Sequence, residues 1–569
     1  MELHHARRTT ARPARLPPVQ GRARPCPFGG LPGVHRHRLR SQLPGGGRHP
    51  GADAAAGGRH DGLIPRHGGT TMSVEESTAR TTPRKRHPRG LPALWGTEMW
   101  ERFSYYGMRA ILVLYLVAPS SRGGLGLPPT TAAGIFGVYG GLVNLLAVPG
   151  GWLADRLWGA HRTVLGGGLV IAAGHCALAL PLAAAGTYLG LLLIAVGTGL
   201  LKPNISTMLG GLYDVPGAPA AHGTARRDAG FSLFYLGINI GAFAAPLVTG
   251  WLGERVDWHA GFGAAAVGML LGLTVYLRGS RQLRPAGPPP RTRATTHQLQ
   301  RAAAWAGCAV GAVAAVVAVV VAAGLGALAG VLYALSALTL VVPALYFVAM
   351  FRAPGLDAVD RSRLRAYIWI FLAATVFWMI AEQGGSLISL FAQRHIDRAL
   401  FGWQIPTGWF QSAGPLYGML LAGVFAALWL RLGHRQPSTA AKFALGLAGL
   451  GVATLLMAGA GLAASDGRRA SPLWLLAAFL VQVLAELCLS PTGLSVTTRL
   501  APHRFAGQIM SLWFLSVAAG SALSAQVVRL SDILPYDVYF AVLGAAALLC
   551  AAAVALARSS LRRLMRGVS

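Results

Sequence analysis

Fourteen apolar stretches of about 20 residues recur between residues 93 and 558, and they constrain the fold more than any other feature of the chain. A helix needs about 20 apolar residues to cross about 30 Å of hydrocarbon. The composition agrees, since 53% of the residues are hydrophobic and only 12% are charged. The sequence therefore predicts an all-α polytopic membrane protein. Its expected spans cover residues 93–118, 131–155, 162–184, 187–212, 228–252, 259–279, 302–324, 327–350, 363–391, 405–430, 440–464, 471–499, 504–529 and 536–557.

Basic residues lie mainly in tails and loops, where they indicate orientation. Arginines crowd residues 278–301 and 558–566, and neither stretch contains an acid. Because cytoplasmic loops are enriched in Lys and Arg, we expect both stretches to be cytoplasmic. An even number of spans then places both termini in the cytoplasm, in a multi-pass protein of the inner (plasma) membrane. This distribution of the net charge of +30 indicates a lipid bilayer as the partner and no nucleic acid.

Residues 1–92 are expected to form a disordered basic region. Residues 1–71 hold 12 Arg and 7 of the 16 His, with many Gly and Pro and no apolar periodicity. The sequence restarts at Met72 with Ser-Val-Glu-Glu, so we expect translation to start at Met72 and residues 1–71 not to be translated. The alternative is a disordered tail that touches anionic lipid.

The first span carries a charged stripe. At about 100° per residue, Glu98, Glu101, Arg102, Tyr105 and Arg109 fall on one side of a helix. Each ionisable group near a bilayer centre costs about 2.5 to 3.5 kcal/mol on insertion scales. The four charges are therefore expected to face one another or a water-filled cavity through which a solute is transported.

Five stretches in a fixed order identify a family. They are residues 150–162 (GGWLADRLWGAHR), 199–206 (GLLKPNIS), 231–241 (FSLFYLGINIG), 377–383 (FWMIAEQ) and 486–495 (ELCLSPTGLS). The first resembles the signature loop of the major facilitator superfamily. Together, over residues 93–558, the chain resembles the proton-dependent oligopeptide transporter family of peptide:H⁺ symporters.

The resemblance implies the major facilitator fold with 14 transmembrane helices. Two six-helix bundles, at residues 93–280 and 363–558, are expected on either side of a linker and a two-helix hairpin at residues 281–362. Residues 559–569 would form a cytoplasmic tail. The resemblance also implies that the signature loop is a cytoplasmic latch, with tight packing at Gly151 and a charge relay among Asp155, Arg156 and Arg162.

Depth along the helices predicts two gates. Arg109 lies about 24 Å along a helix that enters from the cytoplasm near residue 93, and Glu382 lies similarly far along its own helix. The two can therefore meet across the bundles as an extracellular gate. Lys202 and Glu486 lie in the inner halves of helices that start outside, which makes them partners for a cytoplasmic gate. The family resemblance implies the same two pairings.

Proton coupling is expected at the same carboxylates. The proton affinity of a buried carboxylate changes when its ion pair with a cation breaks. We therefore expect Glu382 to take a proton from outside, release Arg109 and let the bundles rock about a central site. Glu98 and Glu101, beside Arg102, would form a second protonation site tied to substrate. The alternative, that these charges only fix helix register, would rarely need so many full charges.

A short peptide needs cations for its carboxylate, and an acid with amides for its amino terminus. Arg102 and Lys202 fit the first need, and Glu486 with Asn239 fits the second. An aromatic side chain in a membrane helix can equally serve packing, and Ser490 can equally bond to its own helix. The further residues expected to contact substrate are Tyr105, Tyr106, Tyr235, Trp378, Ser490, Trp513 and Asn144.

Two positions depart from what peptide carriers of this family usually show. Asn144 stands where a pocket tyrosine is expected, and Gly414 stands where an asparagine is expected before Pro415. Losing that amide removes one partner for a peptide amino terminus, worth about 0.5 to 1.5 kcal/mol. Either the pocket is roomier at one end, or Asn144 supplies an amide from another direction.

The predicted function is a proton-coupled symporter that imports di- and tripeptides by alternating access, as a monomer, driven by the proton gradient without a cofactor or metal. The alternative is proton-coupled transport of another small zwitterionic or peptide-like compound, which the two departures favour. An enzyme would need a nucleophile with a base, or a metal cluster, and no predicted span shows paired His or metal-ligand spacing. A passive channel or a receptor would not need the complete set of coupling charges.

Overall fold

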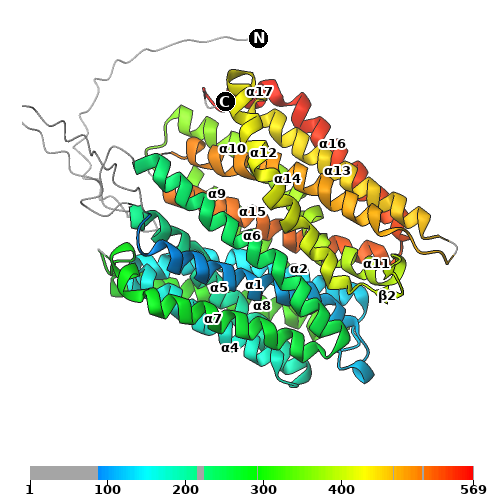
Figure 1. Cartoon of the computed structure of the whole chain (residues 1–569). Helices are drawn as coiled ribbons and strands as arrows, with labels where there is room; N and C mark the ends of the chain where they lie inside the picture. The colour runs from blue at the N-terminus through cyan, green and yellow to red at the C-terminus, as the bar shows by residue number, and fades with distance from the viewer. Residues whose placement is uncertain (1–86, 214–222, 291, 466, 503–504, 568–569) are drawn as a thin grey trace, which may run out of the picture. The chain divides into compact units, whose positions relative to one another are not determined.

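The computed structural model describes residues 87–213, 223–290, 292–465, 467–502 and 505–567, and this part of the chain is almost entirely helical (Figure 1). Residues 1–86, which include the expected start at Met72, lie outside it. The principal helices are α1 Leu91–Val117, α2 Pro129–Leu145, α3 Ala147–Leu153, α4 Ala160–Ala179, α5 Ala183–Tyr213, α6 Gly223–Arg255, α7 Trp258–Leu283, α8 Thr296–Ala322, α9 Ala327–Phe351, α10 Ala358–Ala381, α11 Leu387–His395, α12 Ala413–Leu432, α13 Thr439–Ala463, α14 Pro472–Leu500, α15 Ala506–Val527, α16 Tyr536–Leu556 and α17 Arg558–Leu564.

Thirteen helices of the described chain are long and apolar enough to cross a membrane. The helix α1, with 27 residues, has the length as well, but its charged stripe lowers its hydropathy. Adding α1 to the thirteen gives the expected fourteen spans, and the expected limits agree to within a few residues. The span expected at 187–212, for example, is α5 at Ala183–Tyr213.

Three apolar clusters lie in the described part of the chain. One is made mainly of helices α1 to α7. The other two are made mainly of the helices from α10 to the C-terminal end. The bundles contact each other mainly where α2 packs against α15 and where α6 packs against the short helix η6, Thr407–Ser412.

The two helices of the hairpin between the bundles, α8 and α9, differ in burial. The helix α9 packs on α2 and α15, whereas α8 packs on α9 and has no buried residue. Leu332 of α9 belongs to the apolar cluster of the first bundle, and Phe347 and Met350 belong to a cluster of the second, so only α8 is peripheral.

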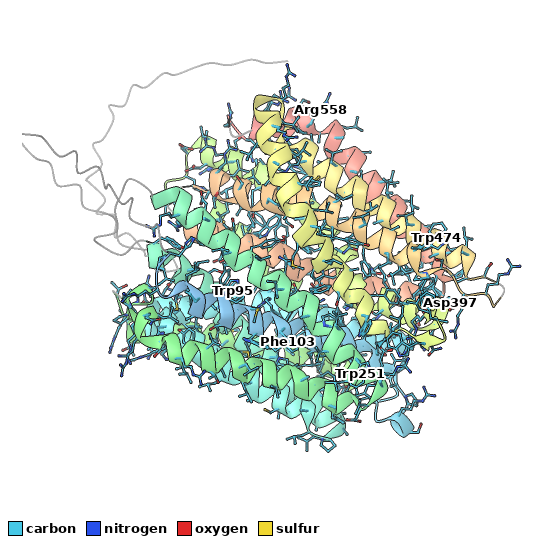
Figure 2. The ribbon with its side chains drawn as sticks, in the orientation of Figure 1. Trp95, Phe103, Trp251, Asp397, Trp474 and Arg558 are labelled. Atoms are coloured by element: carbon cyan, nitrogen blue, oxygen red, sulfur yellow. The ribbon has the colours of Figure 1, made fainter. Side chains whose placement is uncertain are left out.

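Glycines on α6 and α7 let α1 sit deep in its bundle. A Cβ at Gly268 of α7 would lie 2.6 Å from the ring of Phe103, and one at Gly237 of α6 would lie 2.7 Å from Trp95. Both aromatic residues of α1 are labelled in Figure 2. Any side chain at these glycines would push α1 outward, so the close fit fixes which face of α1 turns toward the second bundle.

The two ends of the bundles differ in their connections. The terminal end, where α1 begins and α16 ends, carries the loop before α4, the linker 284–295 and α17. The distal end carries the loop 396–406, in which the two-residue strands β1 Ala399–Leu400 and β2 Trp403–Gln404 pair antiparallel. The sequence did not predict this small hairpin.

At the terminal end, the signature loop docks onto the linker. The backbone oxygen of Arg156 accepts a hydrogen bond from the N–H of Ala294 at 3.0 Å, and its guanidinium donates to Thr292 at 3.3 Å. A Cβ at Gly151 would meet no atom within 4 Å, while one at Gly150 would overlap the backbone of Gly199. The close glycine contact is therefore made by Gly150. Among the described residues, no ion pair includes Asp155 or Arg162, and the charge relay stays a prediction.

Candidate functional site

The charged stripe of α1 is buried between the bundles. Glu98, Glu101 and Arg102 are 4%, 0% and 5% exposed. Nε of Arg102 lies 3.3 Å from Glu98 and 2.5 Å from Glu101, so two carboxylates share one guanidinium. One oxygen of each carboxylate and one nitrogen of Arg102 are buried without a hydrogen-bond partner in the described chain. Because unpaired buried polar atoms are costly, these atoms are suited to receive a proton or a ligand.

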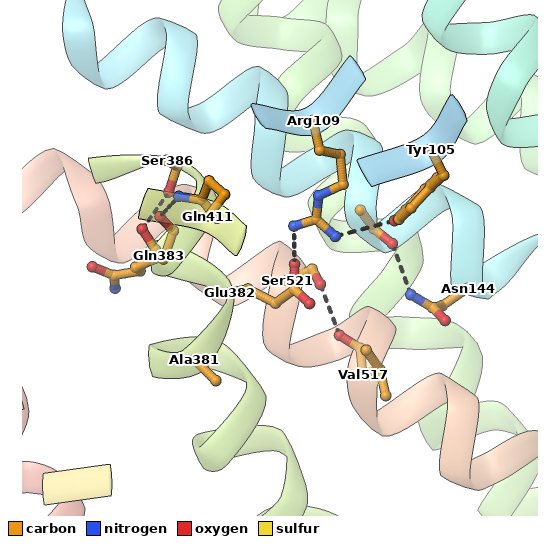
Figure 3. A network of polar contacts seen from close by, with 12 residues as sticks. Tyr105, Arg109, Asn144, Ala381, Glu382, Gln383, Ser386, Gln411, Val517 and Ser521 are labelled. Carbon is orange, nitrogen blue, oxygen red and sulfur yellow. Dashed lines mark hydrogen bonds and ion pairs between the residues drawn. The ribbon is translucent and has the colours of Figure 1, made fainter. Parts of the chain in front are cut away.

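A second ion pair joins the two bundles. Nη2 of Arg109 donates to Glu382 at 2.7 Å, and Nη1 donates to the hydroxyl of Tyr105 at 3.1 Å (Figure 3). The guanidinium also lies 4.5 Å from the ring centre of Phe136. Both charged side chains are largely buried, with 15% and 14% exposed. The ion pair expected from helix depth is thus present, while its action as a gate stays a prediction.

Glu382 is held by a break in its helix. The helix α10 ends at Ala381, and the 3-10 turn η5, Glu382–Gly385, leads into α11. The side-chain amide of Gln411 donates to the carbonyl of Gly384 at 2.6 Å, which fixes the turn. A Cβ built at Gly140 of α2 would lie 3.6 Å from Glu382. The break therefore points Glu382 at α1 and α2 of the first bundle.

A further set of polar contacts joins the bundles at the distal end, and sequence reasoning missed it. Glu254, near the end of α6, accepts hydrogen bonds from the Thr407 hydroxyl at 3.0 Å and the Gly408 N–H at 2.8 Å. It also pairs with Arg398 at 3.4 Å. Burial lowers the pKa of Arg398, while Glu254 opposes that shift. We call these four residues the distal clamp.

Other contacts of η6 support the distal clamp. Nε1 of Trp409 donates to the carbonyl of Leu247 at 2.9 Å, and the Ser412 hydroxyl donates to the carbonyl of Phe243 at 2.7 Å. All of these bonds run from the second bundle to α6. The distal end of the contact between bundles is therefore closed by several hydrogen bonds and two ion pairs.

Lys202 and Glu486, expected as partners, are not paired in this structure. Nζ of Lys202 instead donates to Oδ1 of Asn144 at 3.1 Å and lies 5.5 Å from the ring centre of Phe514. In the part of the chain that the structure describes, neither Lys202 nor Glu486 belongs to an ion pair. Lys202 and Glu486 therefore do not neutralise each other in this structure.

The other expected substrate residues are placed as follows. Asn239 is 8% exposed, and its Oδ1 faces α12, 3.2 Å from where a Cβ of Gly418 would be. Nε1 of Trp378 and the hydroxyl of Ser490 are buried with no hydrogen-bond partner among the described residues. Trp513 is 4% exposed and covers Gly493, so it serves packing here. The remaining two are Tyr235, 47% exposed, and Tyr106, which is partly buried.

The sequence of this chain is similar to those of known proteins. The sequence model of the POT family (PTR2) matches residues 161–541. The uncharacterized transporter YclF of Bacillus subtilis (strain 168) is 44% identical over 502 residues, which is 87% of this chain and 99% of that protein. A di-/tripeptide transporter of Lactococcus lactis subsp. lactis (strain IL1403) is 40% identical over 492 residues, covering 84% of this chain and 97% of its own length.

Solved structures with the same fold are also similar. The crystal structure of the peptide transporter POT in complex with sulfate is 44% identical, with a TM-score of 0.78 over 84% of this chain and 96% of that chain. A POT family transporter in complex with 5-aminolevulinic acid is 35% identical, with a TM-score of 0.77 over 84% of this chain and 97% of that chain.

Proposed function

The chain belongs to the POT family, and from that premise we propose that it is a proton-coupled symporter that imports di- and tripeptides by alternating access. The observation that carries the proposal is the Arg109–Glu382 ion pair, which joins the bundles beside the buried stripe of α1. The family and the named relatives are transporters, so the chain is not an enzyme.

The direction of transport follows from the orientation that the basic loops indicate. The terminal end, with its arginine-rich linker and α17, faces the cytoplasm of a multi-pass inner-membrane protein. The distal end then faces outward, and it is the end at which ion pairs join the two bundles in this structure. Both termini lie in the cytoplasm, and the working unit is a monomer that needs no cofactor.

Proton binding opens the distal end in the proposed cycle. When Glu382 faces the outside and takes a proton, it no longer neutralises Arg109, and the ion pair that closes the distal end is lost. The bundles then separate at that end and approach at the other. Glu98 and Glu101 form the second protonation site, because their shared guanidinium leaves one oxygen of each without a partner.

Substrate is bound by the charges that the protein leaves unpaired. Lys202, with Arg102 beside it, would accept the carboxylate of a peptide, and Glu486 with Asn239 would accept its amino group. A zwitterion that contacts both would draw Lys202 and Glu486 toward each other and so favour closure of the terminal end. Tyr105, Tyr106, Tyr235, Trp378 and Ser490 would line the pocket for the side chains.

Another small zwitterion is the second candidate substrate. A Cβ built at Gly414 meets no atom within 4 Å, so the position of the missing asparagine is open space. A relative at 35% identity is described in complex with 5-aminolevulinic acid, a small zwitterion without a peptide bond. Competition between a labelled dipeptide and small zwitterions for uptake separates the two candidates.

Uptake into proteoliposomes tests the proposal. With an acidic exterior, wild-type protein should accumulate a labelled dipeptide, and collapse of the pH gradient should abolish accumulation. Glu382→Gln should lose accumulation while it retains exchange of labelled for unlabelled dipeptide. Accumulation by Glu382→Gln at the wild-type level would contradict proton coupling through Glu382.

A further inference from the structure

Asn144 is the polar neighbour of Lys202, and both ends of its amide are engaged. Its Nδ2 donates to the carbonyl of Gly140 at 3.0 Å, one turn back in α2, and its Oδ1 accepts from Lys202 at 3.1 Å. The side chain of Asn144 is 6% exposed. The bond to Gly140, drawn in Figure 3, fixes the orientation of the amide group, so that its oxygen is directed at Lys202.

A neutral acceptor suits a cation that must stay available. A carboxylate at this distance would neutralise the ammonium, whereas an amide oxygen orients it and leaves the full charge. The acids of α1 form their ion pairs with Arg102 and not with Lys202, through one oxygen of Glu98 and one of Glu101. In the described part of the chain the ammonium of Lys202 therefore belongs to no ion pair, and Asn144 holds it in a defined position.

The close approach of two helices makes this contact possible. The helix α2 ends at Leu145, and α3 restarts at Ala147, so the chain bends directly after Asn144. Gly150 of α3 and Gly199 of α5 touch through their backbones, and a Cβ on Gly150 would overlap Gly199. This glycine contact brings α5 near enough for Lys202, one turn beyond Gly199, to reach Asn144.

We propose that Asn144 is a positioning residue, which holds the ammonium of Lys202 ready for the carboxylate of the substrate. The inference rests on the proposed function, since it requires that the cargo carries a carboxylate. It also separates the two departures from the family pattern. Because both polar ends of its amide are engaged, Asn144 does not replace the amide that is missing at Gly414. The site should therefore discriminate among substrates more strongly by their carboxylate end than by their amino end.

Binding of a dipeptide and of its C-terminal amide tests the proposal. Dissociation constants for alanyl-alanine and alanyl-alaninamide are measured on the full-length protein in nanodiscs, for wild type, Asn144→Ala, Lys202→Gln and the double variant. Asn144→Ala should weaken binding of the free dipeptide by about 3- to 10-fold, the value of one ordinary hydrogen bond, because the ammonium of Lys202 is still present but no longer held in position. Binding of the amide should change by less than about 2-fold, and Asn144→Ala should have no further effect in the Lys202→Gln background.

Asn204→Ala is the matched control. Asn204 lies two residues from Lys202, is 4% exposed, and among the described residues its side chain bonds to the backbone carbonyls of Gly150 and Leu200. It should weaken both probes alike, if it weakens them at all. Equal weakening of both probes by Asn144→Ala, or the same loss in the Lys202→Gln background, would overturn the positioning role. If wild-type protein binds neither probe, the proposed function fails instead.

Discussion

The two ends of the contact between the bundles are held in different ways. At the distal end, charges are satisfied across the bundles, through Arg109 with Glu382 and Glu254 with Arg398. At the terminal end, Lys202 bonds to Asn144 of its own bundle, and Glu486 belongs to no ion pair in the described chain. The protein's own charges therefore join the bundles at the distal end, while the terminal end keeps two opposite charges that a zwitterion can bring together.

The largest effect is expected from breaking the distal ion pair on the arginine side. Arg109→Met leaves the carboxylate of Glu382 buried without a cation, which costs about 3 to 5 kcal/mol for a buried pair. The fraction of molecules that are closed at the distal end should therefore fall. Spin labels at Arg122 and Ile533, both exposed at the distal end, should report longer distances than in wild type.

The same pair of spin labels can also contradict this prediction. Distances that stay at the wild-type value in Arg109→Met would mean that the distal clamp alone closes this end. The Arg109–Glu382 pair would then be a proton site without a gating role.

The second effect concerns the terminal end. Lys202→Met removes the cation expected to bind the substrate carboxylate, and a hydrogen bond to a charged group contributes about 1.5 to 3 kcal/mol. Dipeptide affinity should fall by about 10- to 100-fold, while distal label distances without substrate stay unchanged. Binding titrations on the labelled protein measure both quantities in one sample. Unchanged affinity would remove Lys202 from the binding site.

Much of this asymmetry could be predicted from the sequence. Helical periodicity places Glu98, Glu101 and Arg102 on one face, and rise per residue puts Arg109 and Glu382 at one depth. These arguments work because a membrane fixes where each helix starts. They do not tell which state of a two-state cycle is populated, so they predicted a contact between Lys202 and Glu486 that this state lacks.

The distal clamp shows a different limit. Arg398 lies in a loop, whose path depends on backbone bonds such as that from Asp397 to Ala470 in the loop before α14. Loops have no periodicity from which a contact over such sequence separation can be derived. The helix break after Ala381 was equally unpredicted, although the two glycines that follow Gln383 were a signal for it.

A smaller effect is expected at the distal clamp. Glu254→Gln removes the charge that pairs with Arg398 and one of the acceptors for Thr407 and Gly408. The cost should be about 1 kcal/mol, because Arg398 keeps its hydrogen bond to the carbonyl of Ile405 and the amide keeps one acceptor oxygen. The closed fraction should fall by about 5-fold relative to the open one. Asp257→Asn is the control, because Asp257 caps α7 within its own bundle. An equal shift in both variants would show that the clamp does not join the bundles.

The smallest effect should come from Gly414→Asn, which tests whether substrate affinity can change without a change at the distal end. A Cβ at Gly414 meets no atom within 4 Å, so the new side chain needs no rearrangement of α12. The added amide would restore a partner for a peptide amino group and should tighten binding of a dipeptide by about 2- to 5-fold. Binding of an N-acetylated dipeptide should not improve, and distal label distances should stay at the wild-type value. An equal gain in affinity for both ligands would mean that the new amide fills space and does not recognise the amino group. The open space at Gly414 would then not determine how the site recognises the amino end of its substrate.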